Sequence, residues 1–430
     1  MNGMTTSASP NESPDFEVGE VLNQQWRIVR KLGKGACSVV YEAKTSDNSA
    51  SAAIKVYKYG DKYLPVYYRE IQIIRQLNAK RDHPGIVTLY NWFTHKGYPC
   101  LVFEVLYCKL QYIISKNNEE GLSLYAVQFL GRQILETLAY MHGKGVVHAD
   151  IKPANIMWCP QTGSVKLIDF GLSIELDDKD AYHQVQSLCY QCPETKRLNY
   201  LIADCSEYLD ETVLSCLCTS AIDVWTVGCI LSFLYTGQKL YSKDDVPQLG
   251  CSHCQAIDTT LKCKCAALMD SVFKPRESDA DVADRTKIVE DLTSLTKSLL
   301  QCKASQRPTA KEALQHPFFQ HDLNPSYQDF LLFPTRILRL LNTVDQRDLD
   351  DDAEYQDICD DIKSEVIKHG NIKKLVMPRE GAGAEKVFIE FEDAGECTHA
   401  QSALMGKYFN GRTVITTFFP VKSFESEDYF

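Results

Sequence analysis

The stretch "VVHADIKPANIM", residues 146–157, decides the fold of most of this chain. It places Asp150, Lys152 and Asn155 within six positions, and "LIDFGLS" at 167–173 adds Asp169. A carboxylate can accept a hydroxyl proton, a lysine can neutralise a phosphate, and carboxylate and amide oxygens bind Mg²⁺. Because these spacings are highly specific, the set indicates an enzyme that transfers a phosphoryl group from a nucleotide.

Residues nearer the N-terminus extend the same pattern. "LGKGACSVV" offers Gly33 and Gly35, whose backbone can approach phosphate closely, and Val40, which can cover a flat base. Lys55 in "AAIKVYK" lies on a predicted strand, and Glu70 on the following predicted helix can pair with it. Taken singly, each of these features also fits a plain hairpin, a surface lysine or a solvated glutamate, so the ordered set carries the prediction.

The ordered set, with "CPE" at 192–194, "DVWTVG" at 223–228 and "QRP" at 306–308, resembles the eukaryotic protein kinases over about residues 20–320. The resemblance implies an N-lobe at 21–105 rich in strands and a helical C-lobe at 106–320. It also implies ATP and Mg²⁺ as cofactors. In that family the form Asp-x-Lys-Pro-x-Asn marks enzymes that act on serine and threonine, and residues 150–155 have this form.

The resemblance assigns site residues one by one. The implied catalytic residues are Asp150, Lys152, Asn155, Lys55 and Glu70. The implied nucleotide contacts are Leu32, Gly33, Gly35, Val40, Ala53, Lys55, Phe103, Glu104, Leu106 and Asp169, with Phe103 as gatekeeper and Glu104 to Leu106 as hinge. The implied metal ligands are Asn155 and Asp169. A buried ion pair between Glu194 and Arg307 is also expected.

One position departs from many kinases. Ala149 stands where an arginine commonly binds a phosphate on the activation segment. That arginine takes no part in proton transfer, and residues 169–194 contain no threonine, so we predict activity without phosphorylation of this segment. Gln191 replaces an arginine of proline-directed kinases, which leaves a proline preference open. An inactive kinase fold that serves as a scaffold is the alternative.

Composition limits the other possibilities. A chain of 430 residues with 44% hydrophobic residues predicts two or three globular domains. The net charge of -11 argues against nonspecific adhesion to nucleic acid or membrane, and favours protein partners. Residues 1–20 are predicted to be disordered. Because they lack a secretion signal and no run of 18 apolar residues follows, we expect an intracellular protein without a membrane span.

The 17 cysteines are expected to be reduced thiols in such a compartment. In "CSHCQAIDTTLKCKC" the residues Cys251, Cys254, Cys263 and Cys265 have a spacing compatible with a structural Zn²⁺ site, with His253 as a substitute ligand. A loop of reduced cysteines explains the same pattern, and we favour that explanation.

After a predicted linker at 321–334, residues 335–425 change pattern. Strand, helix, strand, strand, helix and strand follow in order, which predicts a ferredoxin-like domain of the type found in RNA recognition motifs. The whole chain is therefore assigned to the α+β class.

RNA binding by this domain is the alternative that we disfavour. We place Leu338 and Lys386 at positions where RNA-binding domains stack bases, which leaves only Phe388 as an aromatic platform. Residues 345–365 carry ten acidic and two basic residues, so they repel a phosphate backbone.

These departures, with "KYFNGR" at 407–412, resemble the U2AF homology motif, a variant that binds a tryptophan-containing peptide. The resemblance implies that the ligand's basic residues face Asp357, Asp361 and Glu365, that Lys407 pairs with this acidic helix, and that Phe409 stacks on the indole. A kinase joined to such a module resembles a nuclear kinase that acts on splicing factors. The resemblance therefore implies those substrates and that location, and leaves an additional cytoplasmic pool open.

Overall fold

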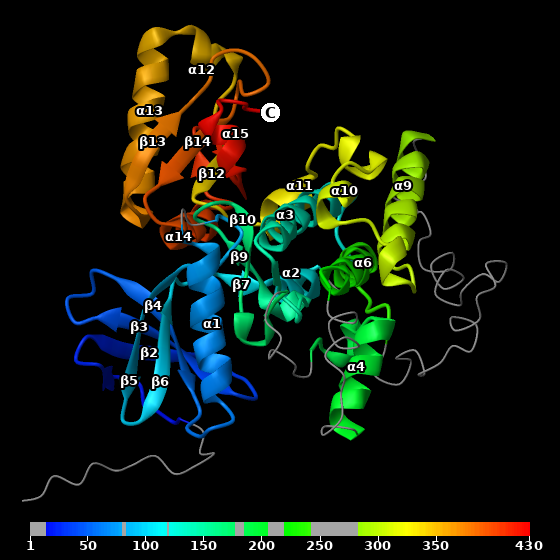
Figure 1. The fold of residues 1–430 in the computed structure, drawn as a ribbon. Helices are drawn as coiled ribbons and strands as arrows, with labels where there is room; N and C mark the ends of the chain where they lie inside the picture. Colours follow the sequence, from blue (N-terminus) through cyan, green and yellow to red (C-terminus); the bar gives the residue numbers. More distant parts are fainter. Residues whose placement is uncertain (1–13, 80–82, 118–119, 177–184, 205–218, 242–282) are drawn as a thin grey trace, which may run out of the picture. The chain divides into compact units, whose positions relative to one another are not determined.

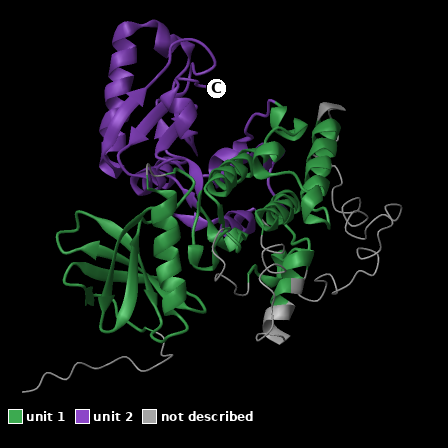
Figure 2. Cartoon of the chain, viewed as in Figure 1, with its two compact units in different colours: residues 1–106, 128–157, 166–321 green, residues 107–127, 158–165, 322–430 purple. Residues whose placement is uncertain are grey.

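The computed structural model describes residues 14–79, 83–117, 120–176, 185–204, 219–241 and 283–430. They divide into two compact units (Figure 2). The first unit comprises residues 1–106, 128–157 and 166–321, and the second comprises 107–127, 158–165 and 322–430. None of the described helices combines the length and apolar character that crossing a membrane requires.

The first unit begins with a six-stranded antiparallel sheet in the order β1-β2-β3-β4-β6-β5 (Figure 1). Its strands are β1 (Val21–Leu22), β2 (Trp26–Lys34), β3 (Ser38–Thr45), β4 (Ser51–Tyr57), β5 (Leu89–His95) and β6 (Tyr98–Phe103), and helix α1 spans Leu64–Leu77. The sequence pattern predicted Lys55 on a strand and Glu70 on the following helix, and these elements are β4 and α1. It missed β5, because the residues of this edge strand are mostly exposed and lack an apolar alternation.

Alternation along β3 and β4 separates core residues from site residues. Val39 and Ile54 are fully buried in the apolar cluster on one face of the sheet. Their neighbours Val40, Ala53 and Lys55 project to the opposite face because successive side chains of a strand alternate. Val40 lies opposite Lys55 in the strand register, so the predicted nucleotide contacts share one face.

The rest of the first unit is mainly helical. Helices α3 (Leu124–Gly143) and α6 (Ala221–Thr236) coincide with the two strongest helical patterns of the sequence. Almost every residue of α6 is buried, and its C-terminus ends at Gly237, which has a φ of 73°. Within the described residues of this unit, the other α-helices are α4 (Pro193–Asp204), α9 (Ala283–Leu299) and α10 (Ala310–Ala313), and the short strands are β8 (Val146–Val147) and β11 (Ile174–Glu175). Strands β9 (Ile156–Cys159) and β10 (Ser164–Leu167) continue into the second unit.

The second unit contains an antiparallel four-stranded sheet in the order β13-β14-β12-β17. Its strands are β12 (Ile337–Leu341), β13 (Ile372–Val376), β14 (Val387–Phe391) and β17 (Ile415–Phe418), and β15 (Tyr408–Phe409) and β16 (Arg412–Thr413) form a hairpin. The helices are α2 (Leu110–Lys116), α11 (Tyr327–Leu332), α12 (Gln346–Asp350), α13 (Asp352–Val366), α14 (Ala394–Leu404) and α15 (Val421–Glu425), with β7 at Cys108–Lys109.

The two faces of this sheet have different coverings. On one face Leu338 and Leu340 pack with buried residues of α13 and α14. On the other face Phe388 and Phe419 pack with Phe330, from α11, and with four residues at the C-terminal end, namely Val421, Phe424, Tyr429 and Phe430. The assignment of Leu338 to a base-stacking position is therefore wrong. It resulted from a slip of one residue, which moves a side chain to the opposite face of a strand.

Part of the predicted linker is ordered in the second unit. Helix α11 begins with a capping box between Ser326 and Asp329. Asp329 also accepts the hydroxyl hydrogen bond of Ser123 at 2.8 Å. The indole N–H of Trp158 donates to the carbonyl oxygen of Pro334 at 2.6 Å. Segments 107–127 and 158–165 thus pack with the C-terminal residues in one compact unit.

The predicted zinc ligands Cys251, Cys254, Cys263 and Cys265 lie outside the described residues, so this site stays a prediction. Among the residues that the structure describes, no group of three or more His, Cys, Asp or Glu side chains is arranged to hold a metal ion. The cysteines of the described ranges are free thiols.

Candidate active site

Lys55 connects the sheet to two carboxylates. Its Nζ lies 2.7 Å from Oε2 of Glu70, on α1, and 2.7 Å from Oδ1 of Asp169. Glu70 is fully buried and also accepts a hydrogen bond from the Tyr57 hydroxyl. Burial alone would lower the pKa of Lys55, but the charges of Asp169 and Glu70 raise it well above its ordinary value. Lys55 therefore remains a cation throughout the neutral range.

The loop from 148 to 155 gathers its polar groups around Asp150. Lys152 Nζ lies 2.7 Å from Oδ2 of Asp150, and Asn155 Nδ2 donates to the same oxygen at 3.0 Å. Ser187 donates its hydroxyl to Oδ1 of Asp150 at 2.9 Å and accepts from Lys152 Nζ at 2.9 Å. Asp150 is consequently held in one orientation by three partners, two of them from its own loop.

Asp223 on α6 holds the backbone of this loop. Its carboxylate, which is fully buried, accepts the N–H groups of His148 at 2.8 Å and Ala149 at 2.9 Å. Nε2 of His142 lies 3.0 Å from the same carboxylate. Ala149 adopts a φ of 63°, in the left-handed region that costs a residue with a Cβ about 1 kcal/mol or more. The two hydrogen bonds that Asp223 accepts offset that cost.

Asp169 faces the loop from the following segment. It has a φ of 67°, and Phe170 behind it is fully buried against the ring of His148. Burial would raise the pKa of Asp169, but the adjacent Lys55 lowers it below its ordinary value. Asp169 is therefore ionised at neutral pH. Its Oδ2 stays available to a cation, because Oδ1 is the atom that contacts Lys55.

Asn155 and Asp169 fit a magnesium ion. The amide nitrogen of Asn155 donates hydrogen bonds to Asp150. Its Oδ1 is therefore free to bind a metal ion. The backbone N–H of Ile168 donates to the carbonyl oxygen of Asn155 at 3.0 Å, so the two predicted ligands come from hydrogen-bonded segments. One carboxylate with one amide oxygen is a typical protein contribution to Mg²⁺, which keeps water and phosphate as further ligands.

The predicted nucleotide contacts line the open face of the first sheet and the segment after it. Leu32 is 39% exposed, and a Cβ on Gly33 would meet no atom within 4 Å, so there is room above the β2–β3 turn. At Gly35 the nearest atom would be the Ser38 carbonyl oxygen at 3.6 Å. Phe103 lies opposite Ala53 in the β4–β6 register and is 7% exposed.

The hinge contains an ion pair that the sequence reasoning missed. Oε1 of Glu104 accepts from Lys166 Nζ at 2.6 Å and from the backbone N–H of Thr88 at 2.7 Å. Leu106, two positions on, is half-buried. Lys166 belongs to a short strand that carries no signature of a charged partner, so only the three-dimensional structure reveals this contact. The pair fixes Glu104 where the hinge begins.

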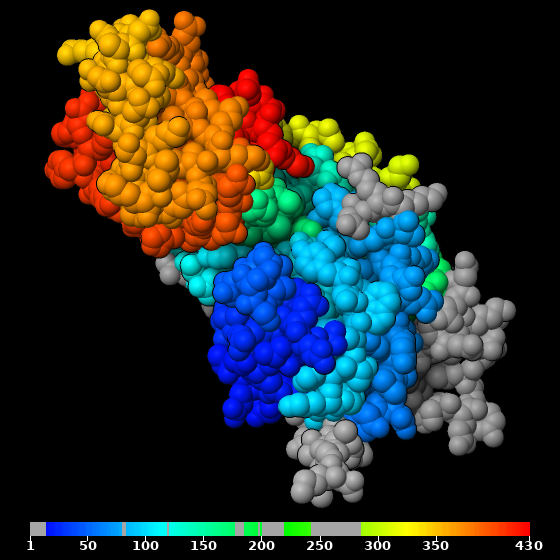
Figure 3. All heavy atoms as spheres, turned by 90° about the vertical axis from the view of Figure 1, so that its left-hand side faces the viewer, coloured from blue at the N-terminus to red at the C-terminus, as the bar shows by residue number. Residues whose placement is uncertain are grey.

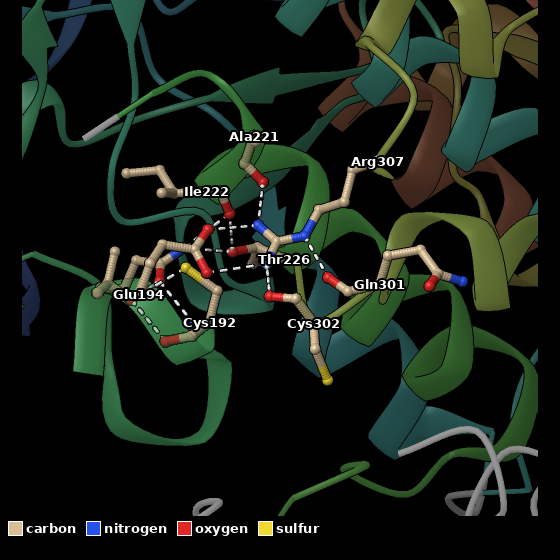
Figure 4. Close-up of polar contacts among 10 residues, drawn as sticks. Cys192, Glu194, Ala221, Ile222, Thr226, Gln301, Cys302 and Arg307 are labelled. Carbon is tan, nitrogen blue, oxygen red and sulfur yellow. Dashed lines mark hydrogen bonds and ion pairs between the residues drawn. The ribbon is translucent and has the colours of Figure 1, made fainter. Parts of the chain in front are cut away.

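The predicted pair of Glu194 and Arg307 is present (Figure 4). Two parallel contacts of 2.5 and 2.8 Å join the guanidinium group to the carboxylate, and the Arg307 side chain is fully buried. Arg307 also donates to the carbonyl oxygens of Gln301 at 2.7 Å and Ala221 at 2.9 Å. All of these contacts satisfy the donors of Arg307. The pair therefore links the end of the activation segment to the helices of the first unit.

A second group of predicted site residues lies in the second unit. Asp357, Asp361 and Glu365 recur along α13, whose buried face carries Ile358 and Ile362. The atoms of α13 form part of the surface visible in Figure 3. Asp357 and Asp361 are exposed, and the structure gives them no ion pair within the described ranges. They form an acidic stripe with unneutralised charge.

The hairpin that carries "KYFNGR" approaches this helix. Lys407 Nζ lies 2.8 Å from Oε1 of Glu365, as predicted. Phe409 is half-buried against the core of the unit, whereas the adjacent Tyr408 is 79% exposed. The sequence reasoning missed the role of Arg412, which reaches back to two carboxylates.

Arg412 lies 2.6 Å from Oδ2 of Asp345 and 2.9 Å from Oδ2 of Asp348. These contacts tie the hairpin to α12. The quoted motif contains Arg412, but nothing in the local sequence indicated which acids it would meet.

Comparison with known proteins agrees with this geometry. The sequence profile described as "Protein kinase domain" matches residues 26–319. The chain therefore belongs to the protein kinase family, with a bilobal fold made of a sheet-rich N-lobe and a helical C-lobe. The serine/threonine-protein kinase Kist of Homo sapiens is 32% identical over 426 residues, which cover 94% of this chain and 94% of that protein.

Two further comparisons are more distant. The serine/threonine-protein kinase AFC1 of Arabidopsis thaliana is 26% identical and matches 76% of this chain and 79% of its own length. A crystal structure of a kinase domain superposes with a TM-score of 0.53 and 22% identity, covering 71% of this chain and 98% of that chain. The predicted enzyme class, a protein serine/threonine kinase that uses ATP and Mg²⁺, is confirmed.

Proposed function

We propose that this kinase phosphorylates splicing factors, and that its C-terminal domain recruits them by binding tryptophan-containing motifs. The residues around Asp150 carry the catalytic half of the proposal, because every group that phosphoryl transfer requires is present and paired. This argues against an inactive scaffold. The acidic stripe beside a half-buried aromatic supports the recruiting half.

In the catalytic step Mg²⁺-bound ATP supplies the phosphoryl group and the positive charge that offsets the developing negative charge. The carboxylate of Asp150 accepts the proton of the substrate hydroxyl, and the hydrogen bond from the Ser187 hydroxyl keeps that carboxylate oriented. Lys152 neutralises charge on the transferred group, and Lys55, fixed by Glu70, orients the remaining phosphates. Asn155 and Asp169 would hold the metal ion.

The activation segment needs no phosphate under this proposal. Ser187 already bonds to Asp150 and Lys152, and Asp223 already holds the backbone of Ala149. A phosphate on this segment would meet no arginine at position 149. The loop is therefore preassembled by charge-assisted hydrogen bonds to Asp150, Lys152 and the buried carboxylate of Asp223.

The residue next to Ser187 supports a preference for proline after the phosphorylated residue. Gln186 has a φ of 59°, and its carbonyl oxygen accepts the side-chain amide of Gln191 at 3.3 Å. A carbonyl oxygen that already accepts one hydrogen bond is a weaker acceptor for the substrate backbone. Proline has no N–H group and loses nothing there, whereas other residues leave a donor unpaired. Gln191 thus takes over the contact that an arginine would make.

The C-terminal domain is proposed to be a ferredoxin-like module of the U2AF homology type. Strand order β13-β14-β12-β17 with α13 and α14 on one face supports that fold. The other face, where RNA-binding relatives stack bases, is covered by Phe330 and by the C-terminal residues Phe424 and Tyr429. An indole would instead stack on Phe409, while basic residues beside it meet the acidic stripe.

The segment that precedes the recruiting domain packs within the second unit. Trp158 is 1% exposed, bonds to Pro334 and contacts the ring of Phe333. Residues 327–332 would therefore belong to the ordered recruiting domain itself. Nuclear location belongs to the same proposal, since splicing factors are its substrates.

A direct binding measurement tests the recruiting half. The full chain should bind a peptide with one tryptophan flanked by arginines, and should not retain a single-stranded oligoribonucleotide at the same salt concentration. Phe409→Ala and Asp357→Lys should each weaken peptide binding about tenfold, which corresponds to about 1.4 kcal/mol. Glu380→Lys, an equal charge reversal at another exposed acid of the domain, should leave it unchanged. Preference for the oligoribonucleotide would overturn the proposal.

A further inference from the structure

Tyr57, the last residue of β4, carries a buried hydroxyl group beside the catalytic lysine. Its side chain is fully buried. Tyr57 lies two positions after Lys55 on the same strand, so both side chains project from the same face of the sheet. The Nζ of Lys55 lies 5.1 Å from the centre of the Tyr57 ring. A polar group buried at this place needs a partner, and the partner is a catalytic residue.

The Tyr57 hydroxyl donates to Oε2 of Glu70, the same oxygen atom that lies 2.7 Å from Lys55 Nζ. Burial in the first place, and the charge of Glu70 in the second, raise the pKa of Tyr57 well above its ordinary value. The hydroxyl therefore keeps its proton at neutral pH and is the donor. The other oxygen of Glu70, Oε1, accepts the backbone N–H of Phe170 at 3.3 Å. Both oxygens of this fully buried carboxylate are thus bonded.

Glu70 needs a partner besides Lys55. The ammonium group of Lys55 is shared, because it also lies 2.7 Å from Oδ1 of Asp169. In the reaction the same ammonium group orients phosphates of the nucleotide, which are further anions that compete for it. A buried carboxylate is stable only when hydrogen bonds and charges satisfy its oxygens. The Tyr57 hydroxyl supplies a donor that the nucleotide does not draw away.

Other contacts hold α1 against the segment at 170–175. A Cβ on Gly171 would lie 2.6 Å from Cγ1 of Val66, so only glycine permits this close approach of the helix. Gln72 Nε2 donates to Oε1 of Glu175 at 2.7 Å. Helix α1 is therefore held by residues of this chain on either side of its catalytic glutamate.

From these contacts we propose that Tyr57 is a positioning residue for phosphoryl transfer. Its hydroxyl holds Glu70 in place, and Glu70 in turn keeps Lys55 aligned for the nucleotide phosphates. Because this restraint comes from the chain itself, the kinase assembles the pair of Lys55 and Glu70 without an activating partner protein. Phenylalanine at position 57 fills the same space but lacks the donor, so it leaves the pair less firmly held.

The test compares two tyrosine-to-phenylalanine variants of the full chain. Tyr57→Phe removes the donor to Glu70 and keeps the ring. Tyr41→Phe is the matched control. Tyr41, on the neighbouring strand β3, is 1% exposed and packs in the apolar cluster on the other face of the sheet, where its hydroxyl donates to the carbonyl oxygen of Pro14 at 3.1 Å. Each variant loses one buried hydrogen bond, so both should show a lower denaturation midpoint.

Steady-state kinetics separate positioning from stability. With a short untethered peptide as substrate, Tyr57→Phe should raise KM for ATP and lower kcat/KM for ATP at least about tenfold, which corresponds to about 1.4 kcal/mol. Its KM for the peptide should not change. Tyr41→Phe should keep the kinetic constants of the unaltered chain at a temperature well below both midpoints. Because this peptide is not recruited through a tryptophan motif, the result does not depend on the recruiting domain.

Amide hydrogen exchange reports the position of the helix without catalysis. Exchange in residues 64–77 should be faster in Tyr57→Phe than in the unaltered chain, because the helix is less firmly held. Tyr41→Phe should leave exchange in these residues unchanged. Faster exchange there in both variants would show a loss of stability in the whole lobe, and would contradict the proposal.

A double-mutant cycle shows whether the hydroxyl acts through Glu70. In a Glu70→Ala background the acceptor is gone, so adding Tyr57→Phe should lower kcat/KM for ATP by less than about twofold. Unchanged kinetic constants in Tyr57→Phe, an equal loss in Tyr41→Phe, or a further tenfold loss on top of Glu70→Ala would each overturn the proposal. So would an unaltered chain that transfers phosphate only after a second protein is added.

Discussion

Asp223 holds Ala149: its Oδ1 accepts the Ala149 backbone N–H at 2.9 Å, and its second oxygen accepts that of His148 at 2.8 Å. The catalytic loop is therefore shaped by a buried carboxylate in the helical lobe, which acts on the backbone. Because a backbone contact does not depend on the side chain at position 149, alanine there is compatible with an ordered loop.

The first prediction concerns activation. Protein that has been treated with phosphatase should phosphorylate a peptide substrate at the same rate as untreated protein, because Asp150, Lys152 and Ser187 are already connected. Mass spectrometry of residues 169–194 would verify that no phosphate remains. Ala149→Arg should give no gain in rate. A requirement for an added upstream kinase would contradict this account of position 149.

The second prediction concerns Asp223. Asp223→Ala leaves the N–H groups of His148 and Ala149 buried without an acceptor, which costs about 1–3 kcal/mol for each. We expect a lower denaturation midpoint and a drop in kcat of at least about tenfold, since Asp150 follows directly in the chain. Asp150→Asn is the matched comparison. It should lower kcat by about 10² or more with an unchanged midpoint.

The third prediction concerns the pair of Arg307 and Glu194. Glu194→Gln leaves the fully buried guanidinium of Arg307 without its counter-ion, and breaking such a pair costs about 3–5 kcal/mol. Urea denaturation should show this loss. Replacing Arg30, whose side chain is 65% exposed beside Glu42, by glutamine should cost less than about 1 kcal/mol. Equal effects at the two sites would show that the buried pair is not specially stabilising.

The fourth prediction concerns pH. Hydrogen bonds from Lys368 and Lys407 lower the pKa of Glu365 from 4.5 to about 2. A carboxylate with a folded-state pKa below its unfolded value stabilises the fold fully above pH 4.5 and loses that contribution as the pH falls toward 2. The link between Lys407 and α13 should therefore persist at pH 4.

Carboxyl chemical shifts in an NMR titration would report the pKa of Glu365 directly. Lys368→Ala should shift its midpoint toward 4.5, and Lys407→Ala should do so to a smaller extent, because Lys368 makes the larger contribution. A midpoint near 4.5 in the unaltered chain would show that the side chains do not pair in solution.

The sequence predicted the catalytic residues because their chemistry demands a fixed order. Asp150, Lys152 and Asn155 sit on one short loop, so their spacing survives any change in the surrounding lobe. The apolar periodicity of residues 124–143 and 221–236 also predicted helices, which are α3 and α6 in the structure. What the sequence could not give were contacts across long separations, such as Glu104 with Lys166 or Arg412 with Asp345.

The errors have equally local causes. Leu338 was assigned to the wrong face because one residue of register inverts a strand, and β12 has apolar residues on both faces. Helices α11 and α15 escaped notice because six and five residues are too few to show a period of 3.6. These two short helices place apolar residues on the face of the sheet where an RNA-binding domain would stack bases.

The central claim is tested most directly by comparing the phosphorylation of two splicing-factor fragments. One fragment carries a tryptophan motif, and the other carries alanine in place of that tryptophan. The account predicts that kcat/KM falls at least about tenfold without the tryptophan and in Phe409→Ala, while phosphorylation of a short untethered peptide stays the same. Equal phosphorylation of the two fragments, or no phosphate transfer to either, would contradict it.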